Sequence, residues 1–133
     1  MSEHYHAIVW IDHQQAKIFQ FDASNADEAT VRSSHPHQHI HHKANAGDSG
    51  HAPVDKAYLK HVAEALSTAR AILITGPASA KNELASYIRQ EKPELAQRIS
   101  GVEAMDHPSD GALMAFARKF FKADDRMHSQ THR

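Results

Sequence analysis

The chain has 133 residues, enough for one domain with its own hydrophobic core and too few for two domains of ordinary size. Its 15 Lys and Arg are balanced by 16 Asp and Glu, so the overall basicity of many nucleic-acid-binding proteins is excluded and any basic surface must be local. The lack of cysteine excludes disulfides, thiolate metal sites and a cysteine nucleophile. The number of histidines, 13, is unusual for a chain of this length. Their protonation around pH 6.5 would add 13 positive charges.

No segment of the sequence predicts export or a membrane span. The apolar run over residues 7–11 lacks a preceding basic segment and is shorter than the roughly 7 to 15 apolar residues of a signal peptide. The longest apolar stretch, residues 71–80, is interrupted by polar and turn-forming residues and falls short of the roughly 18 that a span needs. We therefore expect a cytoplasmic protein with no membrane partner.

Three extended segments are predicted at the start of the chain. The first two are rich in β-branched and aromatic residues and flank Asp12-His13-Gln14-Gln15, a pattern typical of a β-hairpin. Alternation resumes after a polar stretch and predicts a third strand, whose second half consists largely of histidines. The predicted strands cover residues 7–11, 16–21 and 29–41, and residues 44–53 are predicted to form an exposed loop.

Helices and strands are predicted to alternate after this loop. Apolar residues recur at helical spacing in several segments, and continuous apolar runs separate those segments. The predicted elements are a helix over 53–68, a strand over 71–75, a helix over 80–91 capped by Ser79, a short helix over 93–98, a strand over 99–105, and a last helix that starts at Ser109 or Asp110 and packs Leu113, Phe116, Ala117 and Phe120.

The predicted order β-β-β-α-β-α-β-α indicates an α/β fold. A sheet that begins with a hairpin and continues with strands alternating with helices is mixed, with its later strands parallel and helices on both faces. We predict a single three-layer domain over residues 1–122 and a polar C-terminal tail over 123–133. Ligands of such sheets bind near the ends of strands, which here are residues 12–13, 76–81 and 106–110 and the loop over 44–53.

The most distinctive motif is a row of histidines in the third predicted strand. Because alternate residues of a strand share one face, His35, His37, His39 and His41 form a line of imidazoles, followed by His42 and Lys43. Imidazole next to lysine can bond phosphate oxygens, and a phosphate favours the charged form of the ring. A solvated edge strand is the simpler interpretation of the same pattern.

A metal site at His37, His39 and His41 is the alternative interpretation of the row. Imidazole is a good ligand for zinc, nickel and copper. However, the row contains no carboxylate, and a straight strand places only adjacent ligands close together. We therefore expect adventitious binding of these metals and no physiological cofactor.

A second candidate site is the strand-to-helix junction Gly76-Pro77-Ala78-Ser79-Ala80-Lys81. Free backbone N–H groups at a helix start attract anions, and Lys81 adds a full charge, so Ser79 and Lys81 are candidate anion-binding residues. The spacing is not that of a phosphate-binding Walker loop. A tight turn with a serine cap is the simpler interpretation.

Two Asp-His pairs, Asp12-His13 and Asp106-His107, follow predicted strands. Paired carboxylates at strand ends can hold Mg²⁺ for a nuclease. Aspartate is also common where turns and helices begin, and no third carboxylate stands at a recognisable spacing. The turn interpretation is therefore preferred.

The order of elements and several motifs resemble a known family. The motifs are Val9-Trp10-Ile11-Asp12-His13, Ala16-Lys17-Ile18, His41-His42-Lys43, Ile74 to Lys81, Asp106 to Gly111, and Ala117 to Phe121. Together they resemble a group of small bacterial translational machinery proteins and, more distantly, the middle domain of archaeo-eukaryotic peptide-chain release factors and Pelota. This resemblance implies the ribonuclease H-like topology of that middle domain and a partner in the ribosome or tRNA.

The sequence departs from release factors at the loop that follows the third strand. In release factors this loop carries a Gly-Gly-Gln tripeptide that positions water for hydrolysis, whereas Ala46 to His51 contains none. The resemblance therefore does not imply hydrolysis. Pelota likewise lacks the tripeptide.

The leading hypothesis is a non-enzymatic domain that binds ribosomal or transfer RNA. A His-rich metal-binding protein is the first alternative, and a hydrolase of RNA or peptidyl-tRNA acting through His51 or Asp12 is the second. The exposed edge of the His-rich strand is also expected to allow pairing in a homodimer, which imidazole protonation would oppose. The predicted RNA-binding residues are Lys17, His35, His37, His39, His41, His42, Lys43 and His51.

Overall fold

The computed structural model describes residues 6–22, 25–33 and 55–132, with side chains described up to residue 123. A five-stranded sheet in the order β3-β2-β1-β4-β5 forms its centre. β1 pairs antiparallel with β2 and parallel with β4, β2 pairs antiparallel with β3, and β4 pairs parallel with β5. The strands are β1 (His6–Ile11), β2 (Gln15–Phe21), β3 (Ala26–Arg32), β4 (Ala71–Gly76) and β5 (Ile99–Ala104).

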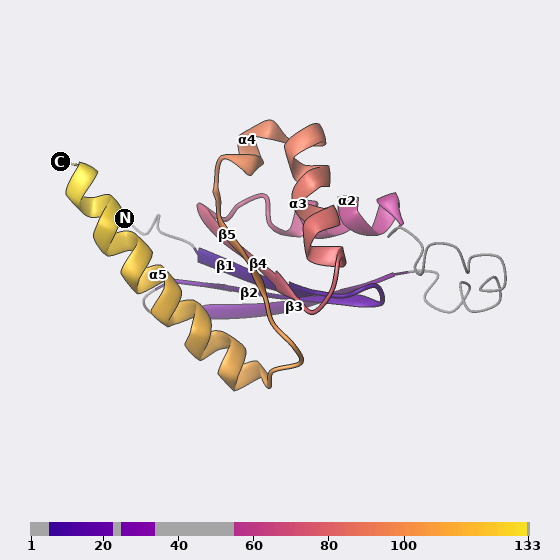
Figure 1. Ribbon diagram of the computed structural model, residues 1–133, viewed down its shortest axis with the longest axis horizontal. Helices are drawn as coiled ribbons and strands as arrows, with labels where there is room; N and C mark the ends of the chain where they lie inside the picture. The colour runs from indigo at the N-terminus through magenta and orange to yellow at the C-terminus, as the bar shows by residue number, and fades with distance from the viewer. Residues whose placement is uncertain (1–5, 23–24, 34–54, 133) are drawn as a thin grey trace, which may run out of the picture.

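Helices cover both faces of this sheet, which gives three layers (Figure 1). Three helices lie on one face and the last helix crosses the other. They are α2 (Lys56–Ala65), α3 (Ala80–Glu91), α4 (Pro93–Ala96) and α5 (Asp110–His132). The predicted mixed three-layer α/β fold is confirmed. No helix within the described residues is long and apolar enough to cross a membrane.

The central strand β1 separates two hydrophobic cores. Val9 and Ile11 face α2 and α3, while Ile8 and Trp10 face α5, so that residues 7–11 are all buried. This burial on both faces explains the continuous apolar run in the sequence. The partly polar β2 strand buries residues on both faces as well and leaves Lys17 and Gln20 only half-buried.

Some predicted boundaries differ from the structure. β3 begins at Ala26 instead of residue 29, and residues 34–41 of the predicted strand lie outside the described residues. α2 ends at Ala65 instead of 68, where a turn replaces the helix and Arg98 donates from Nη1 to the carbonyl oxygens of Ser67 and Ala69, both at 3.1 Å. These contacts satisfy carbonyl groups that the next helical turn would have used.

The packing face of α5 also differs from the prediction. Leu113, Ala117 and Phe121 are buried, whereas Phe116 is 36% exposed and Phe120 is half-buried. The spacing of four residues places the buried side chains in one stripe on β1 and β2. The start is capped as predicted, because Ser109 Oγ accepts from the Ala112 N–H at 3.1 Å. The backbone stays helical to His132, through most of the predicted polar tail.

Candidate functional site

The candidate site lies at one edge of the sheet, where the parallel strands β1, β4 and β5 end. We call this the carboxyl edge and define it as the turn Asp12–Gln15, the junction Gly76–Lys81 and the segment Met105–His107. The chain leaves β1 toward β2 on one side and leaves β4 toward α3 and β5 on the other. Such a change of direction is where open α/β sheets bind ligands.

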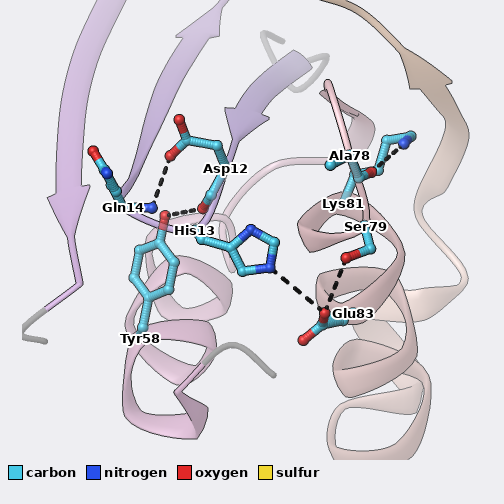
Figure 2. Close-up of polar contacts among 8 residues, drawn as sticks. All are labelled: Asp12, His13, Gln14, Tyr58, Ala78, Ser79, Lys81 and Glu83. Carbon is cyan, nitrogen blue, oxygen red and sulfur yellow. Dashed lines mark hydrogen bonds and ion pairs between the residues drawn. The ribbon is translucent and has the colours of Figure 1, made fainter. Parts of the chain in front are cut away.

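The β1–β2 turn is organised by Asp12. Its Oδ1 atom accepts hydrogen bonds from the N–H groups of Gln14 at 2.8 Å and Gln15 at 2.9 Å. Its carbonyl oxygen accepts from the Tyr58 hydroxyl at 2.9 Å, which joins the turn to the first turn of α2 (Figure 2). The carboxylate of Asp12 therefore serves the turn, as the simpler interpretation of the sequence predicts.

Tyr58 is only 2% exposed. Burial, with a smaller contribution from the charge of Asp12, raises the pKa of its hydroxyl well above the ordinary value of 10. Because the folded-state pKa exceeds the unfolded one, this group favours folding equally at all pH values below about 10 and loses that contribution as pH rises above it.

We expect Tyr58→Phe to destabilise the fold by about 1 kcal/mol at neutral pH, because the carbonyl oxygen of Asp12 loses its partner. Chemical denaturation measures this change. The variant should also lose less stability than the wild type between pH 9 and about 11, since phenylalanine cannot ionise. An unchanged alkaline stability profile would contradict the assignment.

His13 and Ser79 converge on one carboxylate, that of Glu83. The Nε2 atom of His13 lies 3.9 Å from Glu83 Oε2, and the Ser79 hydroxyl donates to the same oxygen at 3.3 Å (Figure 2). This cluster joins the β1–β2 turn to the first turn of α3. Ser79 occupies the predicted cap position, but its side chain makes no cap hydrogen bond, and its hydroxyl donates to Glu83.

The predicted anion-binding residues of this junction have partners within the chain. Lys81 donates from Nζ to the carbonyl oxygen of Ala78 (Figure 2). Glu83 places a negative charge at the helix start, where an anion would otherwise be favoured. To bind a phosphate, Ser79 must therefore release Glu83 and Lys81 must release the carbonyl oxygen of Ala78.

Close backbone approach and one tryptophan hold the carboxyl edge together. Gly76 has φ +157°, and an added Cβ would lie 2.2 Å from the Ile11 carbonyl oxygen. Trp10 is 4% exposed and donates from Nε1 to the carbonyl oxygen of Asp106 at 2.7 Å. The strand ends of β1, β4 and β5 are thus fixed relative to one another.

The second Asp-His pair is exposed. The Asp106 side chain is 94% exposed, and its Oδ1 lies 3.3 Å from Nδ1 of His107, whose ring lies 4.9 Å from that of Trp10. Among the described residues there is no group of three or more side chains suited to holding a metal ion. The contacts of Asp12 match those of a turn residue, whereas the carboxylate of Asp106 contacts the ring of His107.

Of the predicted RNA-binding residues, only Lys17 lies in the described part of the chain. Its Nζ donates to Asp110 Oδ1 at 3.1 Å, which joins β2 to the first turn of α5. Both side chains are partly exposed, so this ion pair is weak and can be exchanged for a phosphate. Outside the described residues lie His35, His37, His39, His41, His42, Lys43 and His51.

Tyr58 and Glu83 are site residues that were not predicted from the sequence. Tyr58 resembles any other apolar residue on the buried side of a helix, and only its hydroxyl contact with Asp12 distinguishes it. Glu83 stands four residues after Ser79, a spacing that brings side chains together on a helix and that could have indicated their contact.

Comparisons with known proteins agree on the fold. No protein-family model and no curated protein matches the sequence. Pelota of Thermoplasma acidophilum superposes with a TM-score of 0.57 at 21% identity over 84% of this chain, and Pelota of Archaeoglobus fulgidus with 0.61 at 15% identity over 86%. The archaeal translation termination factor aRF1 gives 0.57 at 13% identity over 97%.

The chain has the fold of a part of Pelota and aRF1. It covers 31% of each Pelota chain and 40% of aRF1, and therefore less than half of the proteins that it resembles. The resemblance predicted from the sequence motifs is confirmed at the level of the fold.

Proposed function

We propose that this chain is a non-enzymatic binding domain of the translation apparatus, which contacts ribosomal or transfer RNA through residues 35–43 and the loop up to His51. The fold shared with Pelota and aRF1 supports the connection with translation. The lack of a Gly-Gly-Gln tripeptide in residues 44–53 supports a role in binding over hydrolysis.

The proposal rests on the position of the described residues on either side of the histidine-rich segment, residues 34–54. On one side, Ser33 donates its N–H to the carbonyl oxygen of Gln14 at 2.9 Å. On the other, Tyr58 donates to the carbonyl oxygen of Asp12 at 2.9 Å. The described residues on both sides of segment 34–54 therefore lie at the carboxyl edge.

The same edge of the sheet also holds the second candidate site. Ser79 and Lys81 belong to it, so the described flanks of the histidine-rich segment share one edge of the sheet with the helix start that is predicted to bind anions. A polyanion bound there can contact both. The binding energy would come mainly from phosphate contacts, which release counterions and weaken as salt rises.

RNA binding is tested by titrating fluorescently labelled tRNA and ribosomal RNA with the protein. We expect affinity to fall steeply with salt and to rise between pH 7.5 and 6, because protonated imidazoles attract phosphate. Replacing His35, His37, His39, His41 and His42 by Gln should remove the pH dependence. Lys81→Ala should lower affinity at all pH values and reduce the salt slope by about one phosphate contact.

Matched controls come from exposed side chains of α2 that are not part of the carboxyl edge. His61 and Lys60 are exposed on this helix, so His61→Gln and Lys60→Ala should leave both the affinity and its pH dependence unchanged. Binding that is insensitive to salt, or reduced equally by control and test variants, would contradict the proposal.

The same proteins distinguish the alternative functions. Submicromolar zinc or copper binding in equilibrium dialysis, lost when His37, His39 and His41 are replaced by Ala, would favour a metal-binding protein. Turnover of RNA or peptidyl-tRNA that disappears in Asp12→Asn or His51→Ala would favour a hydrolase. We expect neither result.

A further inference from the structure

The outer edge of β3 offers an unpaired strand to a partner. All its residues except Val31 are exposed, and no described segment pairs with the side that faces away from β2. An exposed strand edge presents a row of unsatisfied N–H and C=O groups, which a second strand can pair with. The sequence also predicts self-association along this strand.

The register of β3 shows which residues present these groups. Ser33 donates to the Gln14 carbonyl oxygen and Asp22 donates to that of Asn25, so the hydrogen-bonded pairs with β2 fall on odd-numbered residues of β3. The backbone groups of the even-numbered residues point outward. We call Glu28, Thr30 and Arg32 the β3 edge.

The side chains of the β3 edge share the face of the sheet that α5 covers. Glu28 is paired with Phe19, which packs in the core beneath α5. Thr30 is paired with Lys17, which donates to Asp110 at the start of α5. Arg32 donates from Nη1 to Gln15 Oε1 at 3.3 Å on the neighbouring strand. A negative and a positive side chain thus stand on either side of Thr30, each two residues away.

We propose that two copies of this chain associate by antiparallel pairing of their β3 edges, with Thr30 on the two-fold axis. A two-fold axis in an antiparallel pair passes between a residue and its own copy. With Thr30 in that position, Glu28 of each copy lies opposite Arg32 of the other. The opposed pairs formed by even-numbered residues each exchange both N–H···O=C bonds.

Charge complementarity selects this register over its neighbours. Moving the axis to Ala29 places Glu28 opposite Thr30, and moving it to Val31 places Arg32 opposite Thr30, so either shift removes both charge pairs. The interface joins two five-stranded sheets into one. Because one strand edge is small beside a standard interface of about 1,600 Å², the dimer should depend on concentration.

Cysteine cross-linking tests the register directly, because the chain has no cysteine of its own. Opposed residues of a hydrogen-bonded pair have Cα atoms about 5.5 Å apart, within the range of a disulfide. With diamide as the oxidant of the two thiols, Thr30→Cys should form a covalent dimer. Glu28→Cys alone should not, whereas a mixture of Glu28→Cys and Arg32→Cys should form the mixed disulfide.

Sedimentation equilibrium of ribonuclease-treated protein tests the charge pairing. Glu28→Arg should weaken the dimer about tenfold, since two attractive pairs become repulsive, and the double change Glu28→Arg with Arg32→Glu should restore it. A wild-type protein that stays monomeric at every concentration, or equal cross-linking by Thr30→Cys and Glu28→Cys, would overturn the proposal. Neither result bears on RNA binding, which is measured separately.

Discussion

Gly76→Ala is expected to destabilise the protein by about 3 to 4 kcal/mol, and to lower its Tm by about 10 °C. The new Cβ would lie 2.2 Å from the carbonyl oxygen of Ile11, so either β4 must move away from β1 or the backbone must change. Both responses disturb the carboxyl edge, because Met105 donates its N–H to the carbonyl oxygen of Gly76 at 2.9 Å. Urea denaturation followed by circular dichroism measures the loss.

Gly111→Ala is the matched control for this substitution. No atom lies within 4 Å of the position of its added Cβ, and the residue stands in the first turn of α5. Alanine should therefore be neutral there or stabilise by up to about 1 kcal/mol. Equal stability of Gly76→Ala and the wild type would show that the strands do not approach as closely as described.

Phe121→Ala is expected to cost about 3 to 5 kcal/mol, whereas Phe116→Ala should cost less than about 1 kcal/mol. Phe121 is 2% exposed, and its ring lies 4.5 Å from that of His6 and 6.0 Å from that of Phe21. Truncation leaves a cavity between α5 and the sheet. The same denaturation experiment compares the two variants.

The pair of phenylalanines is an internal control, because both belong to one helix and lose the same atoms. Phe116 is 36% exposed, so its truncation removes little buried surface. If the larger loss followed Phe116→Ala, α5 would pack by the stripe that includes Phe116, as the sequence analysis predicted. Equal losses would contradict both assignments.

The parts of the fold that bury continuous or strictly periodic apolar residues could be predicted from the sequence. β1 and β4 are buried on both faces, and α3 spans residues 80–91 as its spacing predicted. The start of β3 could not be predicted, since Ala26, Asp27 and Glu28 are exposed on an edge strand and carry no alternation of polarity. Pairing with β2 determines their conformation.

The packing stripe of α5 was ambiguous for a different reason. Leu113, Phe116, Ala117, Phe120 and Phe121 are all apolar, so two adjacent stripes satisfy helical spacing. Which of them is buried depends on the sheet beneath the helix. Phe120 belongs to the predicted stripe and is half-buried beside the observed one. Its ring packs over β5, since an added Cβ on Gly101 would lie 3.2 Å from it.

The candidate site was only partly predictable. The role of Asp12 in a turn follows from local sequence, because its partners are the next residues of the chain. The contact of His13 with Glu83 joins distant segments and depends on how β1 and β4 lie side by side. The strand ends named by sequence reasoning do meet at one edge, since parallel strands end on the same side.

Co-sedimentation with ribosomes tests the central claim most directly, namely that this chain is a binding domain of the translation apparatus. Cell lysate is separated on sucrose gradients at low and high salt and at pH 7.5 and 6, and the protein is located by immunoblot. We predict that it travels with ribosomal particles at low salt, more completely at pH 6, and moves to the top of the gradient at high salt. A protein that stays at the top at low salt and at both pH values would contradict the account.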